Sequence, residues 1–193
     1  MIIIIEGLPG SGKTTTIKHL FRTIDKKFND IEIEYLPEIL PETEGSLEDF
    51  YFYLKNDKNK SRKLTSKQDK ICLSDRYWHS TVVYKCAEEQ GMTLKCLINK
   101  YKELYPEKMF HEYFYIYLET DIDNSMKKSA THEVESGWQD RSFVLRTLEL
   151  YRLLYDNLEI FNPAIKGKLL LNVNEMGYEK IEQILEEMIA HER

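Results

Sequence analysis

The chain has 193 residues, of which 42% are hydrophobic and 31% are charged, a balance typical of globular proteins and not of disordered or fibrous ones. Its formal net charge of −6 excludes a surface that attracts nucleic acid or acidic membranes as a whole, so phosphate binding requires a local positive site. At this length we expect one domain spanning residues 1–193.

The chain opens with MIIIIEGLPGSGKTTTIKHL, which predicts a strand, a loop and a helix. Four consecutive isoleucines, 2–5, have high β propensity and no polar alternation, as in a strand covered on both faces of a parallel sheet. After the loop, apolar residues recur at helical spacing: Ile17, Leu20, Phe21 and Ile24. This spacing predicts a helix over 14–26.

The loop GLPGSGKT, residues 7–14, matches G-x-x-x-x-G-K-[ST] at every fixed position and lies between strand and helix, as a P-loop requires. Glycines let the backbone curl around a phosphate, and successive N–H groups with the helix N-terminus form an anion site. We expect Lys13 to reach the β- and γ-phosphates of a nucleoside triphosphate and Thr14 to ligate Mg²⁺. The expected nucleotide-binding residues are Gly7, Pro9, Gly10, Ser11, Gly12, Lys13, Thr14 and Thr15.

Strand and helix patterns alternate along the rest of the chain. Further strands are predicted over 31–36, 71–74, 114–119 and 168–173, and further helices over 46–64, 78–89, 94–104, 122–129, 142–161 and 178–191. This alternation implies right-handed βαβ units. We therefore expect a three-layer, doubly wound α/β fold with five parallel strands and a site at their carboxyl ends.

Two polar segments interrupt these patterns. Residues 56–69, NDKNKSRKLTSKQD, carry five Lys or Arg residues and form either a solvated helix end or part of a site for a phosphorylated ligand. Residues 131–140, THEVESGWQD, form a loop between two helices, where Trp138 could cover a nucleotide or only anchor the loop.

The run ICLSDRYWHSTVVY, residues 71–84, contains a second candidate site. Its apolar strand ends at Ser74, which puts Asp75 and Arg76 at the carboxyl edge of the sheet, beside the P-loop if the two strands are neighbours. A carboxylate there can hold Mg²⁺ directly or through water, and an arginine suits a pair of phosphate oxygens. The alternative is a pair that only caps the next helix; the P-loop in the same chain favours the functional interpretation.

The segments EGLPGSGKTTTIKHL and LSDRYWHSTVVY resemble the thymidylate kinase family among the nucleoside and nucleotide kinases. That family has D-R-Y-x-x-S-x-x-x-Y after its third strand, matched here by Asp75-Arg76-Tyr77, Ser80 and Tyr84. Three later segments, FYIYLETDIDNSMKK, WQDRSFVLRTLELYRLLY and LLLNVNEMGYEKIEQILEEM, are similar to its fourth strand, post-lid helix and last strand with helix. The resemblance implies a P-loop kinase fold of strand order 2-3-1-4-5 with a helical lid, here about residues 127–141.

At matching positions the resemblance also implies roles. Lys13 and Thr14 would bind phosphate and Mg²⁺, with Asp75 near the metal. Arg76 would grip the acceptor's phosphate. Arg141 would follow the lid and contact the donor phosphates or stack on the adenine.

The chain departs from the family at three places. Pro9 replaces an acidic residue of the P-loop, and EYLPEILPETEG replaces an R-E-P-G ending of the second strand, leaving Glu38 as the nearest acid. The helix 46–64 has Asp57 or Lys58 where the family usually has an arginine for the acceptor's phosphate. The acceptor is therefore left open between a nucleoside monophosphate and a free nucleoside or other small hydroxyl compound.

Glu38 follows the second predicted strand and should reach the cleft. Related deoxynucleoside kinases place a glutamate there as the base for the acceptor hydroxyl, and a base needs only hydrogen-bond reach of that proton. The alternative is a solvated loop acid. The aromatic run 50–53 and the pair Trp78 and His79 are either core or, in part, a stacking surface for a planar acceptor.

Together these patterns predict an ATP- and Mg²⁺-dependent phosphotransferase, with a nucleoside monophosphate as the first expected acceptor. Its expected catalytic residues are Lys13, Arg76, Arg141 and Glu38, and its expected metal residues are Thr14 and Asp75. Lys128 and Arg141 would close over the site with the lid and exclude water. A regulatory NTPase or a nucleotide-binding module without an acceptor is the other class; no N-K-x-D guanine motif is present.

The remaining features are those of a protein inside the cell. Cys72, Cys86 and Cys96 lack metal-ligand spacing and are expected to be reduced, buried or half-buried thiols. No apolar run approaches the length of a membrane span, and the strand starts at once, so we expect no signal peptide and a cytoplasmic location. The expected partner is a small-molecule phosphate acceptor, not nucleic acid or membrane; the resemblance adds a homodimer as an option.

Overall fold

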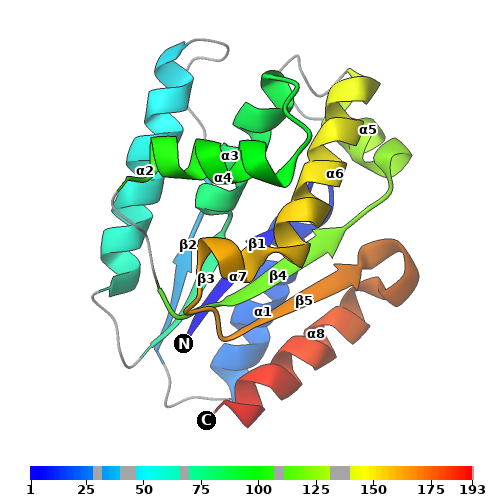
Figure 1. Ribbon diagram of the computed structural model, residues 1–193. Coiled ribbons are helices and arrows are strands. Elements are labelled where there is room, and N and C mark those ends of the chain that lie inside the picture. Colours follow the sequence, from blue (N-terminus) through cyan, green and yellow to red (C-terminus); the bar gives the residue numbers. More distant parts are fainter. Residues whose placement is uncertain (28–31, 40–46, 66–69, 107–110, 131–139, 193) are drawn as a thin grey trace.

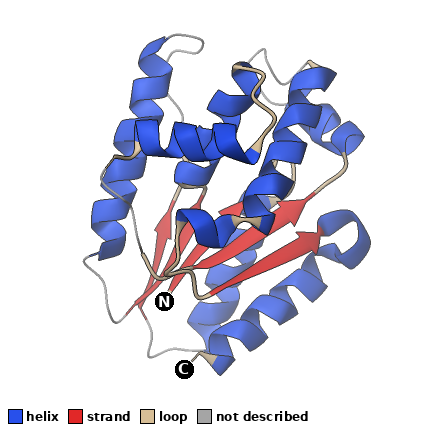
Figure 2. Cartoon of the chain, viewed as in Figure 1, coloured by secondary structure: helices blue, strands red, loops and turns tan. Residues whose placement is uncertain are grey.

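The protein forms a central parallel β-sheet between two layers of helices. The computed structural model describes residues 1–27, 32–39, 47–65, 70–106, 111–130 and 140–192. Its strands are β1 (Ile2–Glu6), β2 (Glu32–Leu36), β3 (Lys70–Asp75), β4 (Phe114–Glu119) and β5 (Gly167–Asn172). They pair in the order β2-β3-β1-β4-β5, every pairing is parallel, and all arrows in Figure 2 run the same way. The expected fold class and strand order are confirmed.

The described helices divide between the two faces of the sheet (Figure 1). One face is covered by α1 (Lys13–Lys27) and α8 (Val173–His191), which contact each other. The opposite side carries the others: α2 (Leu47–Thr65), α3 (Trp78–Glu88), α4 (Leu94–Leu104), α5 (Ile122–Ala130), α6 (Arg141–Asp156) and α7 (Leu158–Phe161). A sheet covered on both faces is the setting that the unbroken isoleucine run requires.

The isoleucines of β1 occupy both hydrophobic cores. Ile3 and Ile5 pack with the α1 and α8 side, and Ile4 packs with the opposite cluster, each fully buried. Burying one such side chain stabilises the fold by about 2 kcal/mol. Successive side chains point to opposite faces of a strand, so a strand between two cores has no polar position to alternate with.

Two predicted helices differ from the structure. The helix predicted over 142–161 is two helices, because Asn157 leaves helical geometry (φ −116°, ψ 19°) and its side chain donates to the Leu153 carbonyl at 2.8 Å. The helix predicted over 178–191 begins earlier, at Val173, where the Asn172 side chain caps the Asn174 N–H, and Gly177 (φ 69°) interrupts it. The prediction therefore identified only the part after that interruption.

Two further expectations concern the state of the cysteines and the lack of a membrane-spanning segment. Cys72 and Cys86 are buried, Cys96 is half-buried, and all three are free thiols, as expected. Among the described helices, none combines the length and apolar character needed to cross a membrane.

Candidate phosphotransfer site

The loop between β1 and α1 has the backbone of a phosphate cradle. Gly7, Gly10 and Gly12 have φ of 152°, 75° and 86°, conformations that side chains with a Cβ rarely adopt. A Cβ on Gly7 would stand 2.5 Å from the Leu118 carbonyl oxygen and 2.6 Å from the Ser11 hydroxyl. The glycines are therefore needed both for the turn and for the close approach of β4.

Lys13 lies inside this loop. Its side chain is only 6% exposed, and its ammonium donates to the carbonyls of Gly7 at 3.1 Å and Leu8 at 3.0 Å. Burial, helped by the charge of Arg76, lowers the pKa of Lys13 to about 8. Nearby, the buried Ser11 hydroxyl has no hydrogen-bond partner within the described ranges. A buried ammonium and an unpartnered hydroxyl in one loop are groups that an anion such as phosphate would satisfy.

The flanks of the loop are also fixed. The Ser125 hydroxyl of α5 donates to the Pro9 carbonyl at 2.7 Å, so α5 supports the loop from the β4 side. The Thr16 N–H donates to the Gly12 carbonyl at 2.9 Å as α1 begins. Thr14 and Thr15 are exposed on the first turn of α1, where helix N–H groups and side chains can reach a ligand.

Asp75 lies directly beside the P-loop, because β3 pairs with β1 in the register Ile5↔Asp75. Its buried carboxylate accepts through Oδ2 from the Thr14 hydroxyl at 3.0 Å and the Tyr35 hydroxyl at 3.4 Å. The other oxygen, Oδ1, is buried without a hydrogen-bond partner in the part of the chain that the structure describes. A hydroxyl and a free carboxylate oxygen side by side fit Mg²⁺, which prefers oxygen ligands and usually keeps few from the protein.

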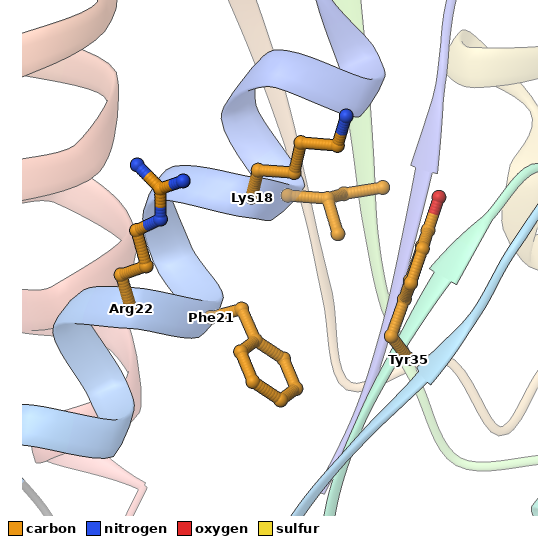
Figure 3. Close-up of a pocket in the computed structure, with 5 residues that line it drawn as sticks. Lys18, Phe21, Arg22 and Tyr35 are labelled. Atoms are coloured by element: carbon orange, nitrogen blue, oxygen red, sulfur yellow. The ribbon is translucent and has the colours of Figure 1, made fainter.

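The Tyr35 ring, whose hydroxyl bonds this carboxylate, also lines a pocket between α1 and β2 (Figure 3). The pocket is lined by Ile17, Lys18, Phe21, Arg22 and Tyr35. Figure 3 shows the Tyr35 ring along its wall and the ring of Phe21 at its other side. Burial and the nearby Asp75 raise the pKa of Tyr35 to about 12, so its hydroxyl remains a donor to that carboxylate at neutral pH.

Arg76 faces the same loop and is paired with Glu38. Its Nε lies 2.7 Å from Glu38 Oε1, and its Nη1 lies 3.9 Å from Glu6 Oε2. The same Nη1, which has two hydrogens to donate, lies within hydrogen-bond distance of four described acceptors: the Gly7 carbonyl at 2.9 Å, the Ser80 hydroxyl at 3.1 Å, the Tyr151 hydroxyl at 3.2 Å and the Tyr84 hydroxyl. Burial alone would lower the pKa of Arg76, but Glu38 raises it, so the guanidinium stays charged.

Glu38 is the acid predicted to follow the second strand, and the structure brings it to the site. Burial would raise the pKa of the Glu38 carboxyl, but the charges of Arg76 and Lys13 outweigh burial and hold it below its ordinary value. The carboxylate is therefore ionised at neutral pH. The sequence prediction located Glu38 near the cleft but did not identify Arg76 as its partner.

Glu6 is a site residue that sequence reasoning missed. It ends β1, is fully buried, and accepts from the Tyr77 N–H at 2.8 Å, the Ser80 hydroxyl at 2.5 Å and the Tyr151 hydroxyl at 3.3 Å. Burial raises its pKa, but hydrogen bonding to His79 and the charge of Arg76 bring it below its ordinary value. An acid closing an apolar strand directly before a P-loop was the available signal.

Lys60 of α2 was also missed, because residues 56–69 were expected to be a solvated helix end or part of a ligand site, and Asp57 was considered only as one of two residues in place of the family's arginine. Each is only 5% exposed, and residues 66–69 lie outside the described ranges. Lys60 donates to the carbonyls of Asp75 at 2.5 Å and Arg76 at 3.0 Å. The signal was available: Phe50, Leu54, Asp57, Ser61 and Leu64 follow helical spacing, with a charge inside an otherwise largely apolar stripe.

Asp57 has an unusual carboxyl group. Its Oδ2 accepts from the Thr81 hydroxyl at 2.7 Å and the Tyr105 hydroxyl at 2.5 Å. Burial raises the pKa of this carboxyl to about 6, despite those hydrogen bonds and the charge of Lys60. Lys58, the other residue considered for this position, is exposed.

Arg141 pairs with a residue outside this cluster. Arg141 is the first residue of α6, its side chain is 58% exposed, and its Nη1 lies 2.5 Å from Asp123 Oδ1 on α5. The predicted lid falls mainly on residues 131–139, which are outside the described ranges together with Trp138 and the side chain of Lys128. The contact of Arg141 with a donor nucleotide stays a prediction.

Three of the aromatic candidates lie in or against the core, whereas Tyr51 is 68% exposed. Trp78 and His79 are fully buried and stacked, with ring centroids 3.9 Å apart, and the His79 Nε2 lies 2.8 Å from the Tyr113 hydroxyl. Burial lowers the pKa of His79, which leaves the ring neutral at neutral pH despite the neighbouring Glu6. At the start of α2, Phe50 packs against the core.

A family model described as thymidylate kinase matches residues 5–166. Among solved structures, the chain is similar to deoxyadenosine kinase from M. mycoides with bound dATP, with 15% sequence identity and a TM-score of 0.65, covering 97% of this chain and 98% of that one. At this identity the likeness shows the fold. Comparison with curated protein sequences finds no match.

Proposed function

Because the chain belongs to the thymidylate kinase family and is thus a P-loop nucleoside or nucleotide kinase, we propose that it phosphorylates the hydroxyl of a free nucleoside with ATP and Mg²⁺. The observation that carries this choice is the pairing of Arg76 with Glu38, 2.7 Å apart. An arginine already neutralised by a carboxylate is poorly placed to bind an acceptor phosphate, whereas the carboxylate is well placed to bind a hydroxyl.

On the donor side, the P-loop residues hold the triphosphate. The loop N–H groups and Lys13 would bind the phosphate oxygens, and Thr14 with Asp75 Oδ1 would hold Mg²⁺. When bound, ATP with Mg²⁺ supplies the phosphoryl group and the charge that offsets its oxygens. Lys13 would exchange its present bonds to the Gly7 and Leu8 carbonyls for bonds to phosphate.

On the acceptor side, Glu38 and Arg76 act together. The ionised Glu38 carboxylate accepts a hydrogen bond from the acceptor hydroxyl, orients its oxygen for in-line attack and takes the proton as the new bond forms. The lowered pKa makes Glu38 a weak base, so orientation is its larger contribution. Arg76, held by Glu6 and the Gly7 carbonyl, fixes the carboxylate in place.

Charge distinguishes the two acceptor classes. Three buried cations of the site (Lys13, Lys60, Arg76) face four carboxylates (Glu6, Glu38, Asp57, Asp75). The described cluster therefore carries no surplus of positive charge, and a monophosphate acceptor would add about two negative charges beside Glu38. Like charges a few ångströms apart in a site of low dielectric repel by several kcal/mol. A neutral nucleoside avoids that repulsion.

A panel of acceptors tests this proposal. Purified protein with ATP and Mg²⁺ is offered free nucleosides, their monophosphates and simple alcohols, and the phosphorylated products are resolved directly. We expect kcat/KM for the best nucleoside to exceed that for its monophosphate by at least about tenfold, equal to about 1.4 kcal/mol of transition-state preference. Hydrolysis of ATP that no acceptor accelerates would instead support an NTPase without a metabolic acceptor.

A nucleoside monophosphate is the second candidate, favoured by the family match over residues 5–166. It requires Arg76 to leave Glu38 and bind the acceptor phosphate, as the resemblance implies. A monophosphate that outcompetes every nucleoside in the panel would establish this reading. The single-domain organisation, the homodimer and the cytoplasmic location stay predictions beside it.

A further inference from the structure

One buried lysine of the site has no part in the reaction as described so far. Lys60 extends from α2, the helix at the β2 edge of the sheet in Figure 1, and its ammonium reaches the carbonyls of Asp75 at 2.5 Å and Arg76 at 3.0 Å. These are the two residues assigned above to the metal and to the acceptor. Lys60 bonds only their backbone carbonyls, while their side chains bond other residues of the site.

The backbone that Lys60 holds is strained. Arg76 has φ of 60°, a left-handed conformation that costs a residue with a Cβ about 1–2 kcal/mol. Three contacts offset this cost: the Arg76 N–H donates to the Ile5 carbonyl at 3.0 Å, the Ser74 hydroxyl donates to the Arg76 carbonyl at 2.8 Å, and Lys60 donates to the same carbonyl. Because strain of this kind persists only where the surroundings impose it, Lys60 is one of the groups that impose it.

The charge of Lys60 is costly where it lies. Burial lowers the pKa of its ammonium, and the carboxylates of Asp57, Asp75, Glu38 and Glu6 counteract that effect. Burying an ammonium costs several kcal/mol, and replacing buried charges with apolar groups is often neutral or stabilising. Stability alone therefore does not account for a lysine at this position, whereas a need to hold the strained turn does.

We propose that Lys60 is a positioning residue of the phosphotransfer site. By holding the Asp75 and Arg76 carbonyls, its ammonium keeps the Asp75 carboxylate turned to Thr14 and the Mg²⁺ position, and keeps the Arg76 guanidinium on Glu38. The inference rests on the proposed function for the identity of the site. The inference goes beyond the proposed function because it links α2, which contacts α3 on the acceptor side, to the geometry of metal binding.

The test compares Lys60→Met with Lys55→Met. Lys55 lies on the same helix, is exposed, and serves as the matched control for the same substitution. Calorimetry measures the binding of a non-hydrolysable ATP analogue with Mg²⁺ and with EDTA. Steady-state kinetics gives kcat, KM and the Mg²⁺ concentration for half-maximal activity, and thermal unfolding reports the stability of each variant.

We expect Lys60→Met to bind the analogue in EDTA within about twofold of wild type, because the hydrogen bonds that Lys60 loses go to the Asp75 and Arg76 carbonyls. The gain in affinity that Mg²⁺ provides should shrink at least about fivefold, and kcat should fall about 10- to 100-fold. Lys60→Arg, which keeps a charged donor, should recover part of both losses. Lys55→Met should match wild type throughout.

Two results would overturn the proposal. One is a Mg²⁺ dependence and kcat for Lys60→Met within about twofold of Lys55→Met. The other is an equal loss of binding with and without Mg²⁺, which would mean general damage to the fold. If Lys60→Met does not fold, Lys60→Gln takes its place under the same criteria. If wild type phosphorylates no acceptor, the proposed function fails, while the calorimetric comparison still decides the role of Lys60.

Discussion

Asp57→Asn replaces a buried carboxyl by an amide of nearly the same shape. The pKa of Asp57 rises from its ordinary value of 3.8 to about 6 on folding, mainly through burial. Between pH 3.8 and about 6, the folded protein binds more protons at Asp57 than the unfolded chain does. The stability that the protonated Asp57 carboxyl contributes is therefore lost as the pH rises from about 4 to about 6. At 1.36 kcal/mol per pKa unit, the ionised carboxylate at neutral pH costs about 3 kcal/mol.

The amide does not ionise, and its oxygen can still accept from Thr81 and Tyr105, which donate to the carboxylate at 2.7 and 2.5 Å. The free energy of unfolding of Asp57→Asn relative to wild type should therefore rise by about 2–3 kcal/mol between pH 4 and pH 7. In a domain of this size that is a relative gain in Tm of about 5–10 °C.

Urea unfolding of both proteins at a series of pH values is the assay, because every other titrating group cancels in the difference. The exposed Asp156, on α6, provides a control when changed to Asn. A difference between wild type and Asp57→Asn that does not change across this pH range would refute the reasoning. It would show that Asp57 is already ionised at about pH 4 in the folded state.

Three further predictions concern the site. Gly7→Ala should lose about 2–3 kcal/mol of stability and bind ATP more weakly, because its Cβ would stand 2.5 Å from a carbonyl oxygen. Gly177→Ala, with φ of 69° and no atom within 4 Å of the added Cβ, should lose only about 1 kcal/mol. Equal losses in thermal unfolding would contradict this prediction. Glu38→Gln should lower kcat about 10²- to 10³-fold and leave the Kd for ATP within about twofold, and an unchanged kcat would exclude it as the base. For Lys13, the pKa of about 8 predicts that ATP affinity falls as the pH rises through that value and that binding takes up a proton there, which calorimetry in buffers of different ionisation enthalpy measures. Because burial lowers this pKa, folding stability should also rise with pH above about 8, where the unfolded chain binds more protons.

The sequence by itself determined the phosphate-binding half of the site. A strand, a glycine loop and a helix N-terminus are neighbours along the chain, so the positions of Gly7, Lys13 and Thr14 follow from local geometry alone. The alternation of strands and helices likewise predicted the layers and nearly every element to within a residue or two. Asp75 could be assigned to the P-loop edge because the carboxyl ends of parallel strands meet there.

The tertiary structure alone decided how charge is arranged around that loop. Glu6 accepts a hydrogen bond from Tyr151, 145 residues away in the sequence, and Lys60 donates one to Asp75, 15 residues away. No local sequence pattern predicts which charged side chain points into the protein. From the sequence alone, a charged residue on a helix is expected to be solvated. Whether it is buried and paired depends on how the helix packs against other elements, and not on the spacing of residues along the helix. For the same reason, only the folded chain shows that Arg76 is already paired with Glu38, the contact on which the choice of acceptor depends.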